Sequence, residues 1–305
     1  MTIDIHAHYY PGDYLERIGM SGLTQLSRSP LGGQSVEERL GLLDRAGIDV
    51  QVLSASQAQP YLADAKEAAA AAAFGNDRFV ELCEAHPGRF YSFAALPLPH
   101  VEESLAEIER SVALPRVVGV TIGCTIAGMH LDSPALEPVW RELDERAVPV
   151  FLHPVGRCGV VDGDDYDFNW LVGAPFEDTL AALRLVLSGV IDRHPGITFI
   201  VPHLGGTLPF LEARVRGYLQ ERGEDALKRM YYDTVSGSVR ALQSAAEYFG
   251  VERLVFGTDY PYADEQVFIH RLKYLDHAGF DTAELEQIRG GRATSLLQLG
   301  EVPKA

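Results

Sequence analysis

The 305-residue sequence predicts an α/β fold, a single (β/α)8 TIM barrel in which residues 1–305 form one domain. Eight short apolar runs alternate with helical stretches along the chain, as in a series of βα units. Polar residues able to bind a metal ion stand at the ends of four of these runs. The carboxyl ends of barrel strands surround a common pocket, so we expect these polar residues to meet there.

The apolar runs resemble the buried strands of a parallel sheet, which are nearly continuous hydrophobic segments. We expect strands at residues 3–6, 50–54, 90–96, 117–122, 148–153, 197–203, 230–234 and 253–258. The second candidate architecture is an open doubly wound sheet, which needs a glycine-rich phosphate-binding turn after its first strand. The sequence His-Ala-His-Tyr-Tyr-Pro stands there instead, at residues 6–11, and favours the closed barrel.

Amphipathic or alanine-rich stretches predict the helices between the strands. We expect helices at residues 35–46, 60–83, 101–113, 136–147, 176–194 and 239–249. The first begins with Ser35, and Glu38 follows three residues later, which is the pattern of a capping box. These helices end near glycine or proline, for example at Gly47 and Pro195.

Two segments are too long and irregular to be simple connections between strand and helix. Residues 9–33 follow the first strand, and residues 155–175 follow the fifth. Long loops at the carboxyl end of barrel strands usually shape or cover the pocket.

Composition restricts the classes of partner. Hydrophobic residues make up 47% of the chain and charged residues 23%, as in soluble globular proteins. The net charge of −17 argues against a nucleic-acid partner and against an anionic membrane surface. No apolar run is long enough to span a membrane. The three cysteines, Cys83, Cys124 and Cys158, include no CxxC pair and indicate a reducing compartment, so a cytoplasmic location is expected.

The candidate metal ligands begin with a histidine pair in the first strand. His6 and His8 are two positions apart, and alternate residues of a strand point to the same face. Taken alone, this pair is as compatible with structural histidines as with a metal site. His153, His203 and Asp259 end three further predicted strands and favour the metal site. Imidazole and carboxylate ligands suit a divalent ion such as zinc that keeps a position open for water or substrate.

Four segments carry a resemblance to a known family. These are Asp-Ile-His-Ala-His at residues 4–8, Trp-Leu-Val-Gly-Ala-Pro at 170–175, Pro-His-Leu-Gly-Gly-Thr-Leu-Pro-Phe at 202–210 and Gly-Thr-Asp-Tyr-Pro at 257–261. The chain resembles the amidohydrolase superfamily over nearly its whole length. It is most similar to the branch that contains aminocarboxymuconate semialdehyde decarboxylase and γ-resorcylate decarboxylase.

This resemblance implies one divalent metal ion per chain, usually zinc and in some members manganese. The implied ligands are His6, His8, His153 and Asp259. His203 would stand beside the metal as an acid/base residue, and Asp259 delivers the proton in the resorcylate-type variant. Both possibilities stay open at this point.

The fourth strand and the arginines add detail to the resemblance. Thr121 and Ile122 stand where binuclear relatives place a lysine, which favours a mononuclear site. Arg214 matches an arginine that binds the substrate carboxylate in relatives, where it acts across a dimer interface, so a homodimer is expected. Arg28 and Arg157 are further arginine candidates. Trp170 is a substrate-binding candidate because it can wall a planar substrate, although ordinary packing explains it equally well.

The resemblance implies a metal-dependent non-oxidative decarboxylase that acts on a small unsaturated or aromatic carboxylic acid. The chemistry would use metal-bound water or a metal-bound substrate oxygen together with a His/Asp acid-base pair. The alternative is metal-dependent hydrolysis of a small ester, lactone or C–C bond, which would use the same ligands. A second alternative is a non-catalytic binding barrel, against which the five intact polar positions count.

Overall fold

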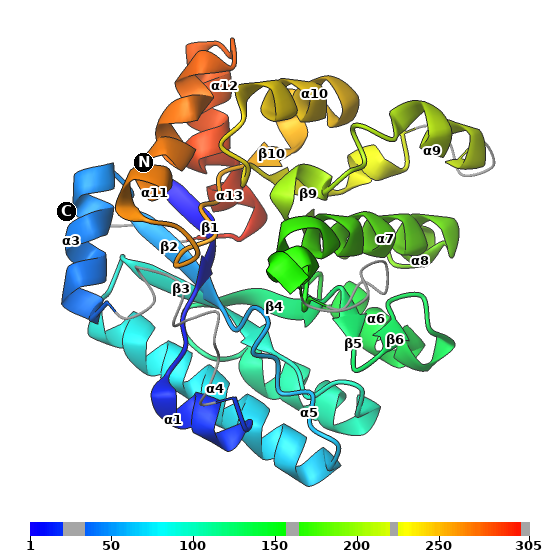
Figure 1. Ribbon diagram of the computed structural model, residues 1–305. Helices are drawn as coiled ribbons and strands as arrows, with labels where there is room; N and C mark the ends of the chain where they lie inside the picture. The colour runs from blue at the N-terminus through cyan, green and yellow to red at the C-terminus, as the bar shows by residue number, and fades with distance from the viewer. Residues whose placement is uncertain (21–33, 157–164, 220–224, 300–305) are drawn as a thin grey trace.

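Eight parallel strands form one sheet that closes into a barrel in the computed structural model, which describes residues 1–20, 34–156, 165–219 and 225–299. The order in the sheet is β1-β2-β3-β4-β7-β8-β9-β10 (Figure 1), so the predicted (β/α)8 fold is confirmed. The strands are β1 (Ile3–His8), β2 (Val50–Ser54), β3 (Phe90–Ala95), β4 (Val117–Gly123), β7 (Val150–His153), β8 (Phe199–Val201), β9 (Tyr231–Asp233) and β10 (Leu254–Val255).

Hydrogen bonds between β1 and the segment that includes β10 close the barrel. The backbone N–H of Ile5 donates to the Phe256 carbonyl at 3.0 Å, and the N–H of Asp259 donates to the His6 carbonyl at 2.7 Å. The buried Asp4 carboxylate supports this seam, since it accepts from the N–H of Thr258 at 2.9 Å and from Gln51 Nε2 at 2.6 Å. The seam therefore places Asp259 directly beside the histidines of β1.

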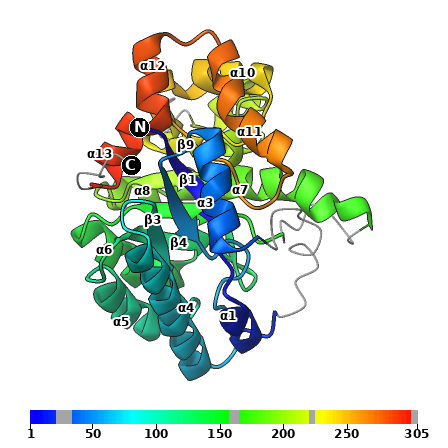
Figure 2. The ribbon, with the colours of Figure 1, turned by 90° about the vertical axis from the view of Figure 1, so that its left-hand side faces the viewer.

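Helices surround the barrel on its outside (Figures 1 and 2). They are α1 (Gly12–Arg17), α3 (Val36–Ala46), α4 (Ala65–Ala85), α5 (Val101–Ser111), α6 (Glu137–Glu145), α7 (Ala174–Leu187), α8 (Val190–Arg193), α9 (Glu212–Leu219), α10 (Val239–Phe249), α11 (Glu265–Lys273), α12 (Thr282–Glu286) and α13 (Arg292–Leu296). A short hairpin of β5 (Thr125–Ile126) and β6 (Met129–His130) follows β4.

Local sequence signals explain where several helices begin and end. Ser35 and Glu38 form the predicted capping box of α3. The helix expected from residue 60 begins only after Asp64, whose side chain accepts hydrogen bonds from the backbone of Lys66 and Glu67. The helix expected at 176–194 is divided into α7 and α8, because Gly189 adopts a left-handed conformation at φ +77°.

The centre of the barrel is filled by apolar side chains from alternate positions of the strands. The rings of Phe93 and Phe151 stack there with centroids 5.3 Å apart, and the His6 ring lies 5.0 Å from Phe151. The candidate site thus begins where this apolar filling ends. Gly119 of β4 allows the apolar side chains to pack this closely, since a Cβ at this position would lie 2.5 Å from the Pro149 carbonyl oxygen and 3.1 Å from the Phe93 ring.

The sequence analysis also made expectations about membrane-spanning segments and about the cysteines. None of the helices within the described ranges is both long enough and apolar enough to cross a membrane. Cys83 and Cys124 are buried free thiols, whereas Cys158 lies outside the described residues.

We expect Gly119→Ala to lower the free energy of unfolding by about 1–3 kcal/mol, because the added methyl group overpacks the barrel. Gly41→Ala in α3 is the matched control, since a Cβ there meets only Arg45 Nη1, at an ordinary contact distance of 3.5 Å. This control is expected to be neutral or to stabilise by about 0.5–1 kcal/mol. Urea unfolding followed by circular dichroism measures both, and equal stabilities would contradict the packing argument.

Candidate active site

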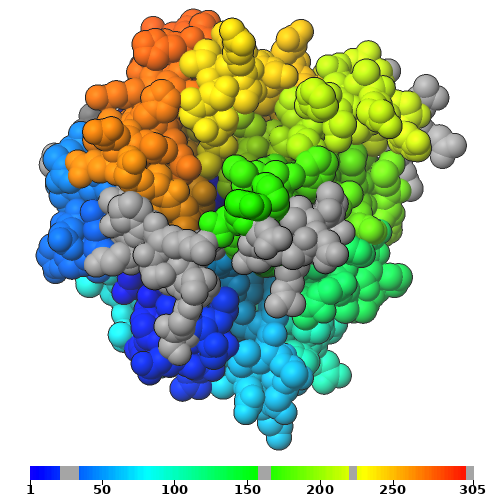
Figure 3. All heavy atoms as spheres, viewed as in Figure 1, coloured from blue at the N-terminus to red at the C-terminus, as the bar shows by residue number. Residues whose placement is uncertain are grey.

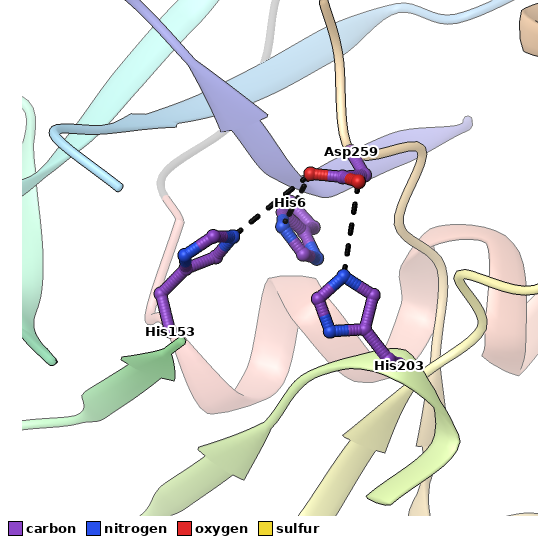
Figure 4. A group of neighbouring side chains, drawn as sticks. All are labelled: His6, His153, His203 and Asp259. Atoms are coloured by element: carbon purple, nitrogen blue, oxygen red, sulfur yellow. Dashed lines mark ion pairs between the residues drawn. The ribbon is translucent and has the colours of Figure 1, made fainter. Parts of the chain in front are cut away.

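Polar side chains from four separate parts of the barrel converge at the carboxyl ends of the strands. The potential ligand atoms of His6, His153, His203 and Asp259 all lie within 4.8 Å of one another. Figure 4 shows the three imidazoles directed toward the Asp259 carboxylate, which forms an ion pair with each. His8 joins the same group, since its Nε2 is 3.1 Å from His6 Nε2.

The two oxygens of Asp259 face different partners. Oδ1 is 3.1 Å from His6 Nε2, 3.0 Å from His8 Nε2 and 3.9 Å from His153 Nε2. Oδ2 is 3.7 Å from His203 Nε2. The carboxylate therefore separates a group of three histidines on one side from His203 on the other.

The other ring nitrogen of each histidine in the first group has its own hydrogen-bond partner. His6 Nδ1 donates to Asp233 Oδ2 at 2.5 Å, and His153 Nδ1 donates to the Pro154 carbonyl at 2.8 Å. His8 Nδ1 lies 2.8 Å from Ser54 Oγ. Such bonds fix the orientation of the ring and direct the lone pair of Nε2 toward a common centre, as in histidines that bind metals.

The charges of the site follow from burial and from the carboxylates. Burial opposes the charge of His6, but Asp233 and Asp259 outweigh it and raise the pKa of His6 to about 9. Burial lowers the pKa of His153 to about 4 and holds the pKa of His8 well below its usual value. Burial would raise the pKa of Asp259, yet the imidazoles, His6 first, hold it well below its ordinary range. His8 and His153 are thus neutral at pH 7, whereas His6 is protonated and faces the ionised carboxylate of Asp259.

This set of donors fits a divalent metal ion. His6 Nε2 and His8 Nε2 lie within hydrogen-bond distance at 3.1 Å, and a metal ion bound there would replace the proton that His6 carries. Nitrogen ligands from histidine with one carboxylate oxygen suit zinc and manganese. The buried side chain of Thr121 occupies the end region of β4, and no lysine stands among the strand ends in the described ranges, so a single ion is the better match.

His203 is held by two aspartates that the sequence analysis did not single out. Asp178 of α7 is fully buried and accepts from His203 Nδ1 at 2.9 Å. Asp233 accepts from the backbone N–H of His203 at 2.8 Å through Oδ1. Burial would lower the pKa of His203, but Asp178 and Asp259 raise it well above its usual value. Asp233 ends β9, so the rule of polar residues at strand ends could have found it, whereas Asp178 lies inside a helix.

The backbone is strained at both acid/base candidates. His203 has φ +53°, and Asp259 has φ +57°, in the left-handed region that side chains other than glycine rarely adopt. Strain of this kind is concentrated at functional sites, where the surrounding structure has to maintain it. The turn that follows His203 is also hydrogen-bonded to α7, because Thr179 Oγ1 accepts from the backbone N–H of Thr207 at 2.8 Å.

A pocket of about 920 Å³ opens onto this group, and His153, His203 and Asp259 are part of its lining. Trp170 also lines the pocket, and its substrate-binding role stays a prediction. Arg214 lies exposed on α9 and is not among the lining residues.

The sequence analysis named two further arginines as candidates for this pocket. Arg28 and Arg157 lie outside the described residues. Arg240 and Arg271, which the sequence analysis did not select, line the pocket together with Tyr262.

We expect Asp233→Asn to weaken zinc binding by about 10- to 100-fold, because His6 loses the carboxylate that orients its ring. Asp276→Asn, which removes an exposed partner of Arg289, is the matched control and should bind zinc normally. Ser54→Ala, which removes the support of His8, is expected to weaken zinc binding less. Competition with a chromogenic chelator measures all three affinities. Unchanged affinity in Asp233→Asn would contradict the assigned role of His6.

Comparisons with known proteins show which family the chain resembles. The family model described as amidohydrolase matches residues 3–299. The γ-resorcylate decarboxylase of Rhizobium radiobacter is 31% identical over 96% of this chain and 93% of its own length. The 2-amino-3-carboxymuconate-6-semialdehyde decarboxylase of Dictyostelium discoideum is 26% identical over 98% of this chain and 92% of its own.

Solved structures show the same architecture. The apo form of Metarhizium anisopliae IDCase superposes with a TM-score of 0.84 at 25% identity, covering 99% of this chain and 98% of that one. A 2,6-dihydroxybenzoate decarboxylase in complex with 2,6-dihydroxybenzoate gives a TM-score of 0.81 at 25% identity, covering 98% and 99%. The family match and the relatives show that the chain belongs to the amidohydrolase family, and its convergent histidines and aspartate are consistent with this.

Proposed function

We propose that this protein is a metal-dependent decarboxylase of a small aromatic carboxylic acid. The observation that carries the proposal is the pairing of His203 with Asp178 beside a group of ligands that fits one divalent ion. Relatives named as decarboxylases of γ-resorcylate and of 6-methylsalicylic acid, the latter from Penicillium expansum, support the reaction and the substrate class.

His6, His8, His153 and Asp259 are the proposed ligands of the ion, which is zinc or manganese. A bound divalent ion supplies positive charge that polarises an oxygen of the substrate. His203 is left for proton transfer, because its Nδ1 is engaged by Asp178 and its Nε2 faces the pocket on the Oδ2 side of Asp259.

The chain's own residues then account for the reaction. The bond between the ring carbon and the carboxylate breaks, carbon dioxide leaves, and the electron pair stays on the ring carbon. His203 Nε2 delivers its proton to that carbon, and the buried Asp178 carboxylate holds the imidazole in position. Both oxygens of Asp259 face imidazoles, so we prefer His203 to Asp259 as the proton donor.

Trp170 and Arg214 are the proposed substrate-binding residues. The indole of Trp170 borders the pocket and packs against Gly156, where an added Cβ would lie 2.8 Å from the ring. It offers a flat apolar wall to an aromatic substrate. Arg214 is outside the pocket of its own chain, so its proposed role requires a second chain.

A homodimer is the proposed assembly, with α9, Phe210 before it and the turn Asn169–Gly173 before α7 covered by a second copy. Phe210 is 90% exposed, Tyr218 is 80% exposed and Leu171 is 69% exposed. Figure 3 shows α9 and the turn before α7 at the surface on the same face of the molecule. Exposed aromatic and apolar side chains of this size indicate an interaction surface. A cytoplasmic location stays a prediction from the cysteine content.

We expect zinc- or manganese-loaded protein to release carbon dioxide from an aromatic acid within a panel of hydroxybenzoates and muconate-type acids. His203→Ala should lower this rate by about 10²- to 10⁴-fold with metal content unchanged, since it removes the proton donor. Asp178→Asn should lower the rate less and also keep its metal. Mass spectrometry of the product measures the reaction.

The other outcomes of this experiment are specific. Addition of water to an ester or lactone, without loss of carbon dioxide, would replace the decarboxylase with the hydrolase. No conversion of any compound, with tight binding of some, would favour a binding barrel. Full activity of His203→Ala would contradict its acid/base role.

We expect the wild-type protein to have about twice its chain mass of 33.4 kDa in solution. Replacing Phe210 and Tyr218 together by serine should yield monomers, because the proposed interface loses its exposed aromatic side chains. Val267→Ser, at an apolar side chain of α11 that is 42% exposed, is the control. Light scattering after gel filtration measures the mass, and a dimer that survives the double substitution would place the interface elsewhere.

A further inference from the structure

One wall of the pocket combines positive charge with hydroxyl groups. Arg240 and Ser244 of α10 and Arg271 of α11 line the same pocket as His203 and Asp259. A hydrogen bond of 3.0 Å between His270 Nε2 and the Gly237 carbonyl joins α11 to the turn before α10. The two arginines therefore stand on neighbouring elements that are held together.

Arg271 is the more enclosed of these two arginines. Its side chain is only 13% exposed, whereas Arg240 is exposed at the rim. Arg271 donates from Nη1 to the Thr258 carbonyl, and its Nε is buried without a hydrogen-bond partner among the described residues. An enclosed guanidinium with an unsatisfied donor is costly unless another group compensates its charge.

In the described part of the chain, one carboxylate, that of Asp259, partly compensates the charge of Arg271. Asp259 Oδ2 lies 4.0 Å from Arg271 Nη1, at the outer limit for an ion pair. The same carboxylate also faces His6, His8 and His203, and in the proposed function it binds a divalent ion. Little of its negative charge is then available to Arg271.

The size and the overall charge of the protein add to this argument. A volume of about 920 Å³ is near the upper end of the roughly 300–1,000 Å³ found for ligand pockets, so a substituted ring can extend from the ligand group to the α10–α11 wall. The net charge of −17 repels anions from the molecule as a whole. An anionic ligand therefore needs local cations where it binds.

We propose that Arg271, with Arg240 at the rim, forms a subsite for a second acidic group of the substrate, one that does not contact the metal ion. The substrate class is thereby narrowed to aromatic acids with two acidic substituents, one at the metal ligands and one at Arg271. This inference rests on the proposed function for the position of the first acidic group.

The test compares the binding of benzoate with that of benzene-1,3-dicarboxylate to zinc-loaded protein by calorimetry. The wild-type protein should bind the dicarboxylate about 10-fold more tightly, as expected for a charge-assisted contact. Arg271→Gln should abolish this preference while benzoate affinity and zinc content change by less than about twofold, and Arg271→Lys should keep part of it. Lys273→Gln, an exposed cation on the same helix, is the control and should behave as wild type.

Two results would overturn the subsite. One is equal affinity of the wild-type protein for the two acids. The other is a general defect of Arg271→Gln. A loss of zinc, or an equal loss of affinity for both acids, would show that Arg271 supports Asp259 instead. Binding does not require turnover, so the outcome is separate from that of the decarboxylase proposal. A preference for the dicarboxylate in a protein that releases no carbon dioxide would keep the subsite and refute only the reaction.

Discussion

The geometry of the site depends on the hydrogen bonds of the buried carboxylate of Asp233. Its Oδ2 accepts from His6 Nδ1 at 2.5 Å, and its Oδ1 accepts from the backbone N–H of His203 at 2.8 Å. The imidazole of His6 outweighs the effect of burial and lowers the pKa of Asp233, so this carboxylate stays ionised. One side chain at the end of β9 thereby fixes the proposed metal ligand His6 of β1 and the proposed acid/base residue His203, which follows β8.

Asp4 has a comparable role at the seam of the barrel. It connects β1 to Thr258, the residue before Asp259, and to Gln51 of β2. Buried carboxylates with several donors are costly to disrupt, because the lost hydrogen bonds cannot be replaced by water. The barrel can therefore maintain the left-handed backbone of Asp259 and His203, which would relax in a less constrained loop.

The site concentrates cationic and metal-binding groups in a protein that is otherwise strongly acidic. The proposed metal ligands and the enclosed guanidinium of Arg271 both adjoin the Asp259 carboxylate, at a pocket that Trp170 lines. Electrostatic attraction is strong in such an enclosed volume, where water screens charges poorly. An acidic aromatic ligand matches both features, and selectivity among such ligands would come from the positions of the cations around Asp259.

The sequence alone determined the eight strands and the histidines and aspartate at their ends, because strand periodicity and apolar patterning are local properties. It placed the start of α4 too early and missed the break at Gly189, where a single cap or backbone conformation decides the boundary. Only the tertiary structure brought Asp178 to His203, Asp233 to His6 and Arg271 to Asp259. The partners Asp233 and His6 are 227 positions apart, and the register and closure of the barrel, which no local pattern encodes, decide which side chains meet.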